Sequence, residues 1–378
     1  MSAFASRRRL GGWRLATTGL LLAGVAALVA GTIVDPQHTM GWDFRGAYLP
    51  AAEAIVHGRS PYLAATSPAG HYVYPPQLAL ALVPFTVLPH GLSIPVAVLL
   101  SASLVAAALA VLGIRDLRVY AAVFLWAPTW NELDTASVSA ALVLALALAW
   151  RYRDSALRCG SALGLAIPAK IFLWPLVVWL VATRRLRALG VSLLLGLGLT
   201  ALAWAAIGFD GLTSYPGMLR ALERAEAPHS YSLTAIATSF GLPAGLGRAL
   251  VLLAVGALLI GCVACTRRGD DLRAFTFSIA AALAVTPIMW EHFLLVLLVP
   301  LAVARPGFSP IWLLPIALWI TPRATSDPVE KVLPVLVGAV LVAVVVGPVR
   351  HRLRVSGTSP AASQGLDDAA PVGREVPA

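Results

Sequence analysis

The sequence predicts an all-α polytopic membrane protein, and three observations support this. The 378-residue chain is 59% hydrophobic and 12% charged, whereas an average soluble domain is roughly 45–50% apolar and 25% charged. Its Leu, Ala and Val residues form continuous runs, unlike the alternating pattern of a membrane β-barrel. Its basic residues form short clusters between apolar spans, as cytoplasmic loops do. The net charge of +10 therefore reflects membrane topology, and no nucleic-acid partner is expected.

The basic clusters orient the first elements when each is placed on the cytoplasmic side. The first helix, about residues 13–34, runs outward and is expected to be retained, because no clear A-x-A cleavage site follows it. A long first outer loop occupies about residues 35–76. The chain then returns through a short re-entrant piece at about 78–89 and a full span at about 92–113.

The middle of the chain is expected to contain two pairs of short elements. Segments 119–130 and 135–150 form an out-and-back pair, with residues 131–134 at the apex. The stretch 160–182 is flanked by basic clusters at both ends, so we expect a hairpin with Lys170 at its tip. Two prolines bracket that break. A lysine at mid-bilayer would cost about 2.5–3.5 kcal/mol, which also favours the hairpin.

The remaining elements bring the total to about twelve full or partial crossings in one domain, residues 1–350. A disordered cytoplasmic tail, residues 351–378, is expected from its Gly, Ala, Pro, Ser and Asp content. The expected elements are a span at 188–207, a second outer segment at 208–243, a span at 244–265, and pairs at 274–287 with 292–304 and 309–321 with 332–347.

The other ionisable residues then share the outer face of the membrane. Convergent polar groups in an apolar setting are typical of a binding or catalytic site. These groups come from separate segments of the chain: Asp43, Glu132, Asp134, Lys170, His229, Glu291 and His292.

Asp43 is the leading candidate for chemistry. It lies where the first helix leaves the bilayer, and ionisable groups there are costly to place. A positioned carboxylate can act as a general base. Asp is also a good helix N-cap, so Asp43 alternatively caps an interfacial helix at about residues 44–57.

Four motifs, which begin at Asp43, Tyr72, Gly164 and Thr286, together resemble glycosyltransferase family 87, the polyprenyl-phosphate-dependent hexosyltransferases of the GT-C class. The resemblance extends over about residues 40–305. The residues that carry it are the Asp-Phe to His-Gly-x-x-Pro-Tyr stretch Asp43–Tyr62, Tyr-x-Tyr-Pro-Pro at Tyr72–Pro76, Gly164–Pro175 and Thr286–His292.

The resemblance implies a GT-C fold with an outer-loop catalytic Asp, carried here onto Asp43. It implies a polyprenyl-phosphate sugar donor, usually mannose, and a lipid-anchored glycan acceptor, as in actinobacterial phosphatidylinositol mannoside and lipoarabinomannan synthesis. It also implies a multi-pass cell-membrane protein whose active site lies on the outer face. Two motifs depart from the family pattern, at Trp130–Asp134 and at Trp290–Phe293.

Cations are expected to stabilise the charge that develops on the leaving phosphate. The candidates are Lys170, Arg45, Arg59 and His292. Arg45 and Arg59 equally suit contact with headgroups of membrane lipids.

Sugar and acceptor binding is assigned to polar and aromatic residues of the outer segments. Glu132 and Asp134 alternatively pair with Lys170, and the aromatic residues alternatively form an interfacial belt. The candidates are Glu132, Asp134, Trp290, Glu291, His229, Tyr62 and Tyr74. No D-x-D, G-x-G-x-x-G or phosphate-loop motif is present, so we expect no nucleotide-sugar site, no cofactor and no obligatory metal.

Two other functions remain open from the residues alone. A secondary transporter or lipid flippase also needs intramembrane charges and broken helices, although the two halves show no evident repeat. The altered Trp130–Asp134 and Trp290–Phe293 motifs also fit a catalytically degenerate membrane partner of a cell-envelope complex.

Overall fold

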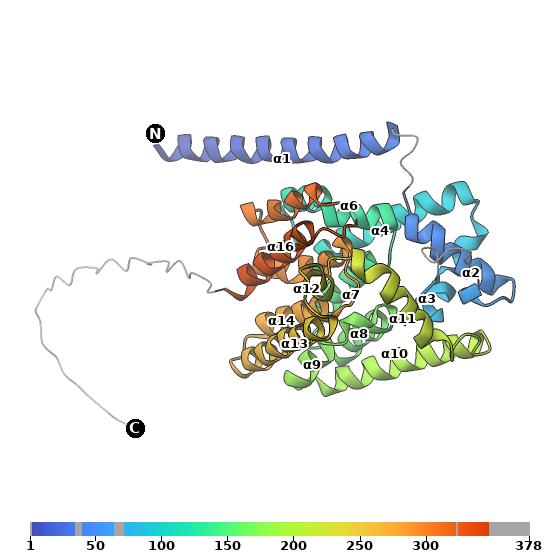
Figure 1. Ribbon diagram of the computed structural model, residues 1–378. Coiled ribbons are helices and arrows are strands. Elements are labelled where there is room, and N and C mark those ends of the chain that lie inside the picture. The colour runs from blue at the N-terminus through green and yellow to red at the C-terminus, as the bar shows by residue number, and fades with distance from the viewer. Residues whose placement is uncertain (1, 35–39, 64–71, 323, 348–378) are drawn as a thin grey trace, which may run out of the picture. The chain divides into compact units, whose positions relative to one another are not determined.

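Helices account for all the regular secondary structure in the described part of the chain (Figure 1). The computed structural model describes residues 2–34, 40–63, 72–322 and 324–347, and no strand occurs among them. The predicted disordered tail at 351–378 lies outside the described residues. The prediction of an all-helical membrane protein is confirmed.

Five of the described helices are long and apolar enough to cross a membrane. At 1.5 Å per residue, about 20 apolar residues cross about 30 Å of hydrocarbon. The predicted first helix is present but starts earlier, at residue 2. The five helices are α1 (Ser2–Val34), α4 (His90–Val111), α10 (Leu186–Ala206), α13 (Ala244–Arg267) and α16 (Pro328–Val346).

The other helices are too short to cross a bilayer alone, so their polar ends must be satisfied inside the protein. They are η1 (Phe44–Tyr48), α2 (Leu49–Val56), η2 (Pro61–Leu63), α3 (Pro76–Leu82), η4 (Val83–Val87), α5 (Leu117–Leu125), α6 (Ala127–Thr135), α7 (Ser139–Arg151), α8 (Ala156–Ala169), η5 (Ile171–Leu173), α9 (Leu176–Ala182), α11 (Tyr215–Glu226), η6 (Ala227–His229), α12 (Leu233–Ser239), α14 (Asp271–Val285), η7 (Glu291–Leu297), α15 (Leu298–Ala304) and η8 (Pro310–Ile320).

The predicted break at Lys170 is confirmed. Helix α8 ends at Ala169, and Lys170 has extended backbone angles, φ −143° and ψ 103°. Pro168 lies in the last turn of α8, and Pro175 precedes α9. Proline has no amide hydrogen, so Pro175 cannot donate to the carbonyl four residues earlier, and an α-helix cannot continue unbroken through this segment.

Helix α8 is held in place by close packing against α10 (Figure 1). Gly160 and Gly164 are four residues apart on the α8 face that contacts α10. A Cβ atom at Gly160 would lie 2.5 Å from the Ala188 carbonyl oxygen, and one at Gly164 would lie 2.9 Å from the Ser192 carbonyl oxygen. Small residues at this spacing let two membrane helices approach closely. The α8–α10 contact therefore fixes the end of α8 that carries Lys170.

The expected apex at residues 131–134 is wrong. These residues lie inside helix α6, and the turn falls after it, at Ala136, which has a left-handed backbone with φ 47°. The apex was expected there because residues 131–134 separate the apolar segments 119–130 and 135–150. The structure instead buries Glu132 completely, because hydrogen-bond donors from the next turn reach its carboxylate.

Candidate active site

Asp43 lies in the first helical turn that the structure describes after α1. It has helical angles, φ −67° and ψ −40°, and its side chain makes no capping hydrogen bond. Gly41, two residues earlier, has φ +75°, and a Cβ there would lie 2.8 Å from the Ile94 side chain. The next five residues form the π-helical turn η1. Such turns frequently occur at functional sites. The N-cap interpretation of Asp43 is therefore wrong.

Asp43 is half-buried, and its surroundings favour the protonated acid. Burial raises the pKa of the Asp43 carboxyl to about 6, Lys170 opposes this shift and Glu226 adds to it. A group with a pKa near physiological pH suits general acid–base chemistry. Asp43 makes no ion pair or hydrogen bond with any residue that the structure describes.

Lys170 is buried and its ammonium is held by two neighbours. Nζ donates a hydrogen bond to Ser139 Oγ at 3.1 Å and lies 3.7 Å from the centroid of the Phe293 ring. The Phe293 ring in turn stacks on Phe172 at 5.2 Å. Electrostatic interactions link Lys170 to Glu132 and Asp43, but no described carboxylate forms an ion pair with it. Its charge is therefore positioned without being neutralised by direct contact.

Glu132 organises the start of helix α7. Its carboxylate accepts hydrogen bonds from Ser137 Oγ at 2.6 Å and from the Ala140 amide at 2.9 Å. A carboxylate at a helix N-terminus is stabilised by the free amides there. Ser137 and Ser139 also hydrogen-bond each other at 3.2 Å, so Glu132 indirectly fixes the Ser139 hydroxyl that holds Lys170.

His292 is buried and hydrogen-bonds to α6. Its Nδ1 lies 2.7 Å from Asn131 Oδ1. Because an amide oxygen only accepts, Nδ1 carries the proton in this contact. Electrostatic coupling also links His292 with Lys170. Asn131 and His292 therefore join α6 and η7 beside the lysine.

Tyr74 is placed beside Asp43, whereas Tyr62 lies one aromatic layer away. The Tyr74 ring meets Tyr48 edge-on at 5.3 Å. Burial and the Asp43 charge raise the pKa of the Tyr74 hydroxyl, which keeps it a neutral donor. Tyr62 donates to the Tyr74 carbonyl oxygen at 3.1 Å and stacks on Trp204 at 5.5 Å. Tyr62 thus supports Tyr74.

Three other predicted residues are fully or partly buried. Asp134 is buried in α6. Glu291 is buried and accepts a hydrogen bond from the Thr321 hydroxyl. Trp290 packs partly buried against the main hydrophobic core. No described contact joins Trp290 or Glu291 to Asp43.

The three remaining predicted residues are exposed. They are Arg45, Arg59 and His229. Exposed arginines near a membrane suit lipid headgroups better than a buried phosphate. The backbone carbonyl of His229 accepts a hydrogen bond from the Thr325 amide, so this residue has a structural contact of its own.

Four residues near the site were not predicted. Tyr48 and Asn131 lie in motifs that the sequence singled out, Asp43–Tyr62 and Trp130–Asp134, but neither was chosen as a site residue. Nothing in the local sequence distinguishes Ser139. Glu226 is an acidic residue in the predicted second outer segment, and that position could have marked it as a site candidate. Its interaction with Asp43 depends on how α11 folds back, and local sequence does not encode that.

The described chain is a helical membrane protein in which a buried lysine, Lys170, interacts electrostatically with the half-buried Asp43. The model of glycosyltransferase family 87 matches residues 72–297, well over half of the chain. The chain belongs to glycosyltransferase family 87 and is a membrane glycosyltransferase. The matched range includes Lys170, Glu132 and His292 but begins after Asp43. Comparison with curated proteins and with solved structures found no significant match.

Proposed function

We propose that this glycosyltransferase moves a hexose, mannose, from a polyprenyl-phosphate donor to a lipid-linked glycan acceptor of the phosphatidylinositol mannoside or lipomannan type. The observation that carries this proposal is the pair of Asp43 and Lys170, a base candidate and a buried cation that interact electrostatically without an ion pair. A carboxylate base and a cation match the two charges that glycosyl transfer from a phosphate involves, a proton to accept and a leaving phosphate to stabilise.

Asp43 is the proposed general base. The acceptor hydroxyl gives its proton to the Asp43 carboxylate while its oxygen attacks the anomeric carbon of the donor sugar. The bond from that carbon to the phosphate oxygen breaks, and the phosphate leaves with the electron pair. One carboxylate without a second as nucleophile suits a single displacement, which inverts the anomeric carbon, by analogy with inverting glycosidases.

Lys170 is the proposed partner of the leaving phosphate. Ser139 and Phe293 hold its ammonium, so the charge is in place before the reaction and needs little reorganisation. His292 lies beside it and is proposed to contact the donor as well. The exposed Arg45 and Arg59 are proposed to bind headgroups of the surrounding lipids.

The site is proposed to lie on the outer face of the cell membrane, within one GT-C domain at residues 1–350. The support is the separation of basic clusters from Asp43 and Lys170 along the sequence. Cysteines introduced at positions 45 and 268, in a background without the three native cysteines, test the topology. An impermeant thiol reagent should label position 45 and spare position 268 in intact cells. Labelling of position 268 alone would overturn the outer-face assignment.

The donor is tested with purified protein in nanodiscs that receive one donor at a time. Polyprenyl-phosphate mannose should support transfer to a lipid-linked acceptor, and GDP-mannose should not. Efficient transfer from GDP-mannose without a lipid-phosphate intermediate would refute the donor assignment. Polyprenyl-phosphate glucose, tested in the same way, checks the choice of sugar.

A further inference from the structure

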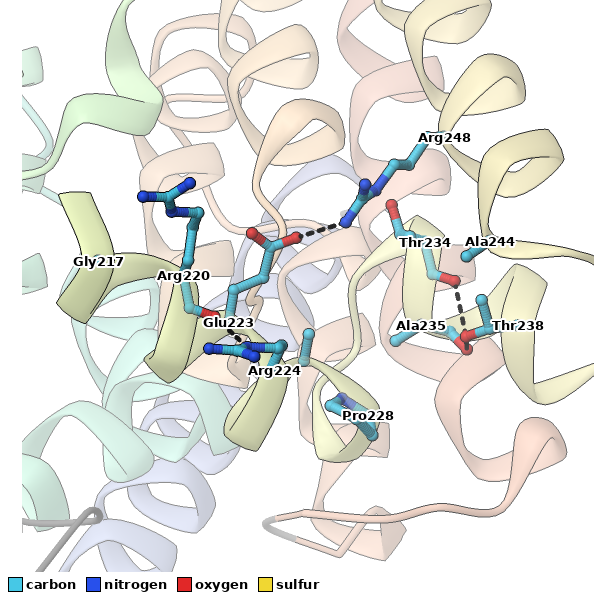
Figure 2. A pocket seen from close by; sticks show the side chains of 11 residues that line it. Gly217, Arg220, Glu223, Arg224, Pro228, Thr234, Ala235, Thr238, Ala244 and Arg248 are labelled. Atoms are coloured by element: carbon cyan, nitrogen blue, oxygen red, sulfur yellow. Dashed lines mark hydrogen bonds and ion pairs between the residues drawn. The ribbon is translucent and has the colours of Figure 1, made fainter.

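A groove of about 660 Å³ lies between helices α11, α12 and α13, apart from the contacts around Lys170. We name it the α11 groove. Figure 2 shows Arg220, Glu223 and Arg224 on α11, with Arg248 on the first turns of α13 opposite. Its lining residues are Gly217, Arg220, Glu223, Arg224, Ala227, Pro228, Thr234, Ala235, Thr238, Ala244 and Arg248.

The α11 groove contains more arginines than are paired with a carboxylate among the described residues. Arg248 Nη2 contacts Glu223 Oε1 at 3.3 Å, which bridges α13 and α11 (Figure 2). Arg220 and Arg224 use only their Nε atoms, each donating to a backbone carbonyl four residues earlier. Among the described residues, no carboxylate pairs with Arg220 or Arg224. Two exposed guanidinium groups are therefore available for an anion.

Helix α11 links this groove to Asp43. Glu226, the last residue of α11, interacts electrostatically with Asp43. Arg224 precedes Glu226 by two residues, which is about 3 Å of helix rise. The other end of α11 is anchored by Tyr215, whose hydroxyl donates to the Val73 carbonyl at 2.9 Å and whose ring packs on Trp204 at 5.7 Å. The last turn of α11 thus carries both a residue that lines the groove, Arg224, and the acid that interacts with Asp43, Glu226.

An exposed apolar surface begins beside the groove. Arg248 lies in α13, a candidate membrane span of which only 17% is buried. Leu246, Leu250 and Leu253 on that helix are 50%, 47% and 70% exposed. A cationic groove at the end of an exposed apolar helix suits a molecule with an anionic head and acyl tails.

We propose that the α11 groove binds the phosphodiester headgroup of the lipid acceptor and so holds the acceptor sugar near Asp43. This inference rests on the proposed function, because it assigns the acceptor of that reaction. Arginine suits the role because its planar fork binds two phosphate oxygens at once. The lipid tails lie along α13, and Thr234 and Thr238 supply hydroxyls at the other wall.

Binding is tested by native mass spectrometry of the purified, detergent-solubilised protein with phosphatidylinositol. The variants are the pair Arg220→Gln with Arg224→Gln, and Arg248→Gln, with the exposed Arg268→Gln at the far end of α13 as the control. The double variant should retain phosphatidylinositol at least about tenfold less well, because it loses the charged hydrogen bonds from two guanidinium groups to the phosphate. Arg268→Gln should behave as wild type. Equal melting temperatures check that all variants fold.

Two competition experiments identify the part of the lipid that binds. Diacylglycerol, which lacks the phosphate, should not compete for the groove, and millimolar inorganic phosphate should compete only weakly. Equal competition by inorganic phosphate would make the groove a simple anion site and overturn the proposal. Unchanged phosphatidylinositol retention in the double variant would overturn it as well.

Transfer kinetics separate this proposal from the proposed function. The double variant should raise KM for the lipid acceptor at least about tenfold, with KM for the polyprenyl-phosphate donor unchanged. Transfer that proceeds normally in the double variant refutes the groove and leaves the function intact. Arginine-dependent lipid retention without any transfer in the wild type refutes the function and leaves a lipid-binding groove.

Discussion

Two charged clusters of this protein use their carboxylates in opposite ways. Asp271, at the start of α14, accepts hydrogen bonds from Trp179 Nε1 at 2.8 Å and from Arg185 Nη2 at 2.7 Å, and it pairs with Arg153 at 3.3 Å. Asp43 has no such partner among the described residues, although Lys170 lies within electrostatic range. Asp271 has oppositely charged partners in direct contact, whereas Asp43 and Lys170 form no ion pair among the described residues.

The difference separates a structural cluster from a reactive one. Partnered charges stabilise the contact between α9 and α14, where Arg185 also stacks on the Trp179 ring at 5.0 Å. Charges that are held without direct neutralisation destabilise the empty protein and suit a ligand that completes them. Substitutions in the first cluster should affect stability, and substitutions in the second should affect activity.

The largest expected effect is the loss of activity when Asp43 is replaced by asparagine, compared with the same replacement at Asp271. Asp43→Asn should lower transfer by about 10²-fold or more, because the acceptor hydroxyl loses its base. Asp271→Asn should keep the turnover of folded protein and lower stability by about 1–3 kcal/mol, because Arg185 loses a charged partner. Turnover and melting temperature are measured on both purified variants. Equal turnover losses in the two variants would remove the distinction.

Lys170 should show the next largest effect. Lys170→Ala should weaken use of the polyprenyl-phosphate donor by about 10²-fold, in the range seen when a charge-stabilising group is removed. Lys170→Arg should recover only part, since a planar fork cannot replace a compact ammonium against Ser139 and Phe293. Donor and acceptor dependences of the rate are measured separately. An effect confined to the acceptor would contradict the phosphate role.

The smallest effect is a pH-dependent gain of stability in Asp43→Asn. The native pKa of Asp43 is raised from 3.8 to about 6, so the native protein holds a proton that the unfolded chain releases. That contribution is present below about pH 4 and is lost as the pH rises through about 6. Asp43→Asn should therefore melt higher than wild type at pH 7.5, and the gap should narrow toward pH 4.5. A lower melting temperature at pH 7.5 would indicate that Asp43 has a stabilising partner.

The helical class and the break at Lys170 were predictable from sequence, because each has a local signal. Proline positions mark the break, and continuous apolar runs mark the helices. The position of Glu132 was not predictable. Its burial inside α6 depends on hydrogen bonds from the Ser137 hydroxyl and the Ala140 amide. The pattern of apolar segments in the sequence does not reveal such contacts.

The approach of Glu226 to Asp43 was equally hidden from the sequence. It depends on the contact of Tyr215 with Val73, a hydrogen bond between residues 142 positions apart. Long-range contacts of this kind carry no local pattern, so α11 was expected only as an undefined part of the second outer segment. The basic groove beside it was hidden for the same reason.

The pH dependence of kcat/KM for transfer tests most directly whether Asp43 is the base. The proposal requires the Asp43 carboxylate to be ionised, so the rate should fall as the pH drops below about 6. Glu226→Gln removes a charge that raises this pKa, and the acidic limb should therefore move to lower pH while transfer persists. A profile that stays flat from pH 5 to pH 8 in the wild-type protein would contradict the account.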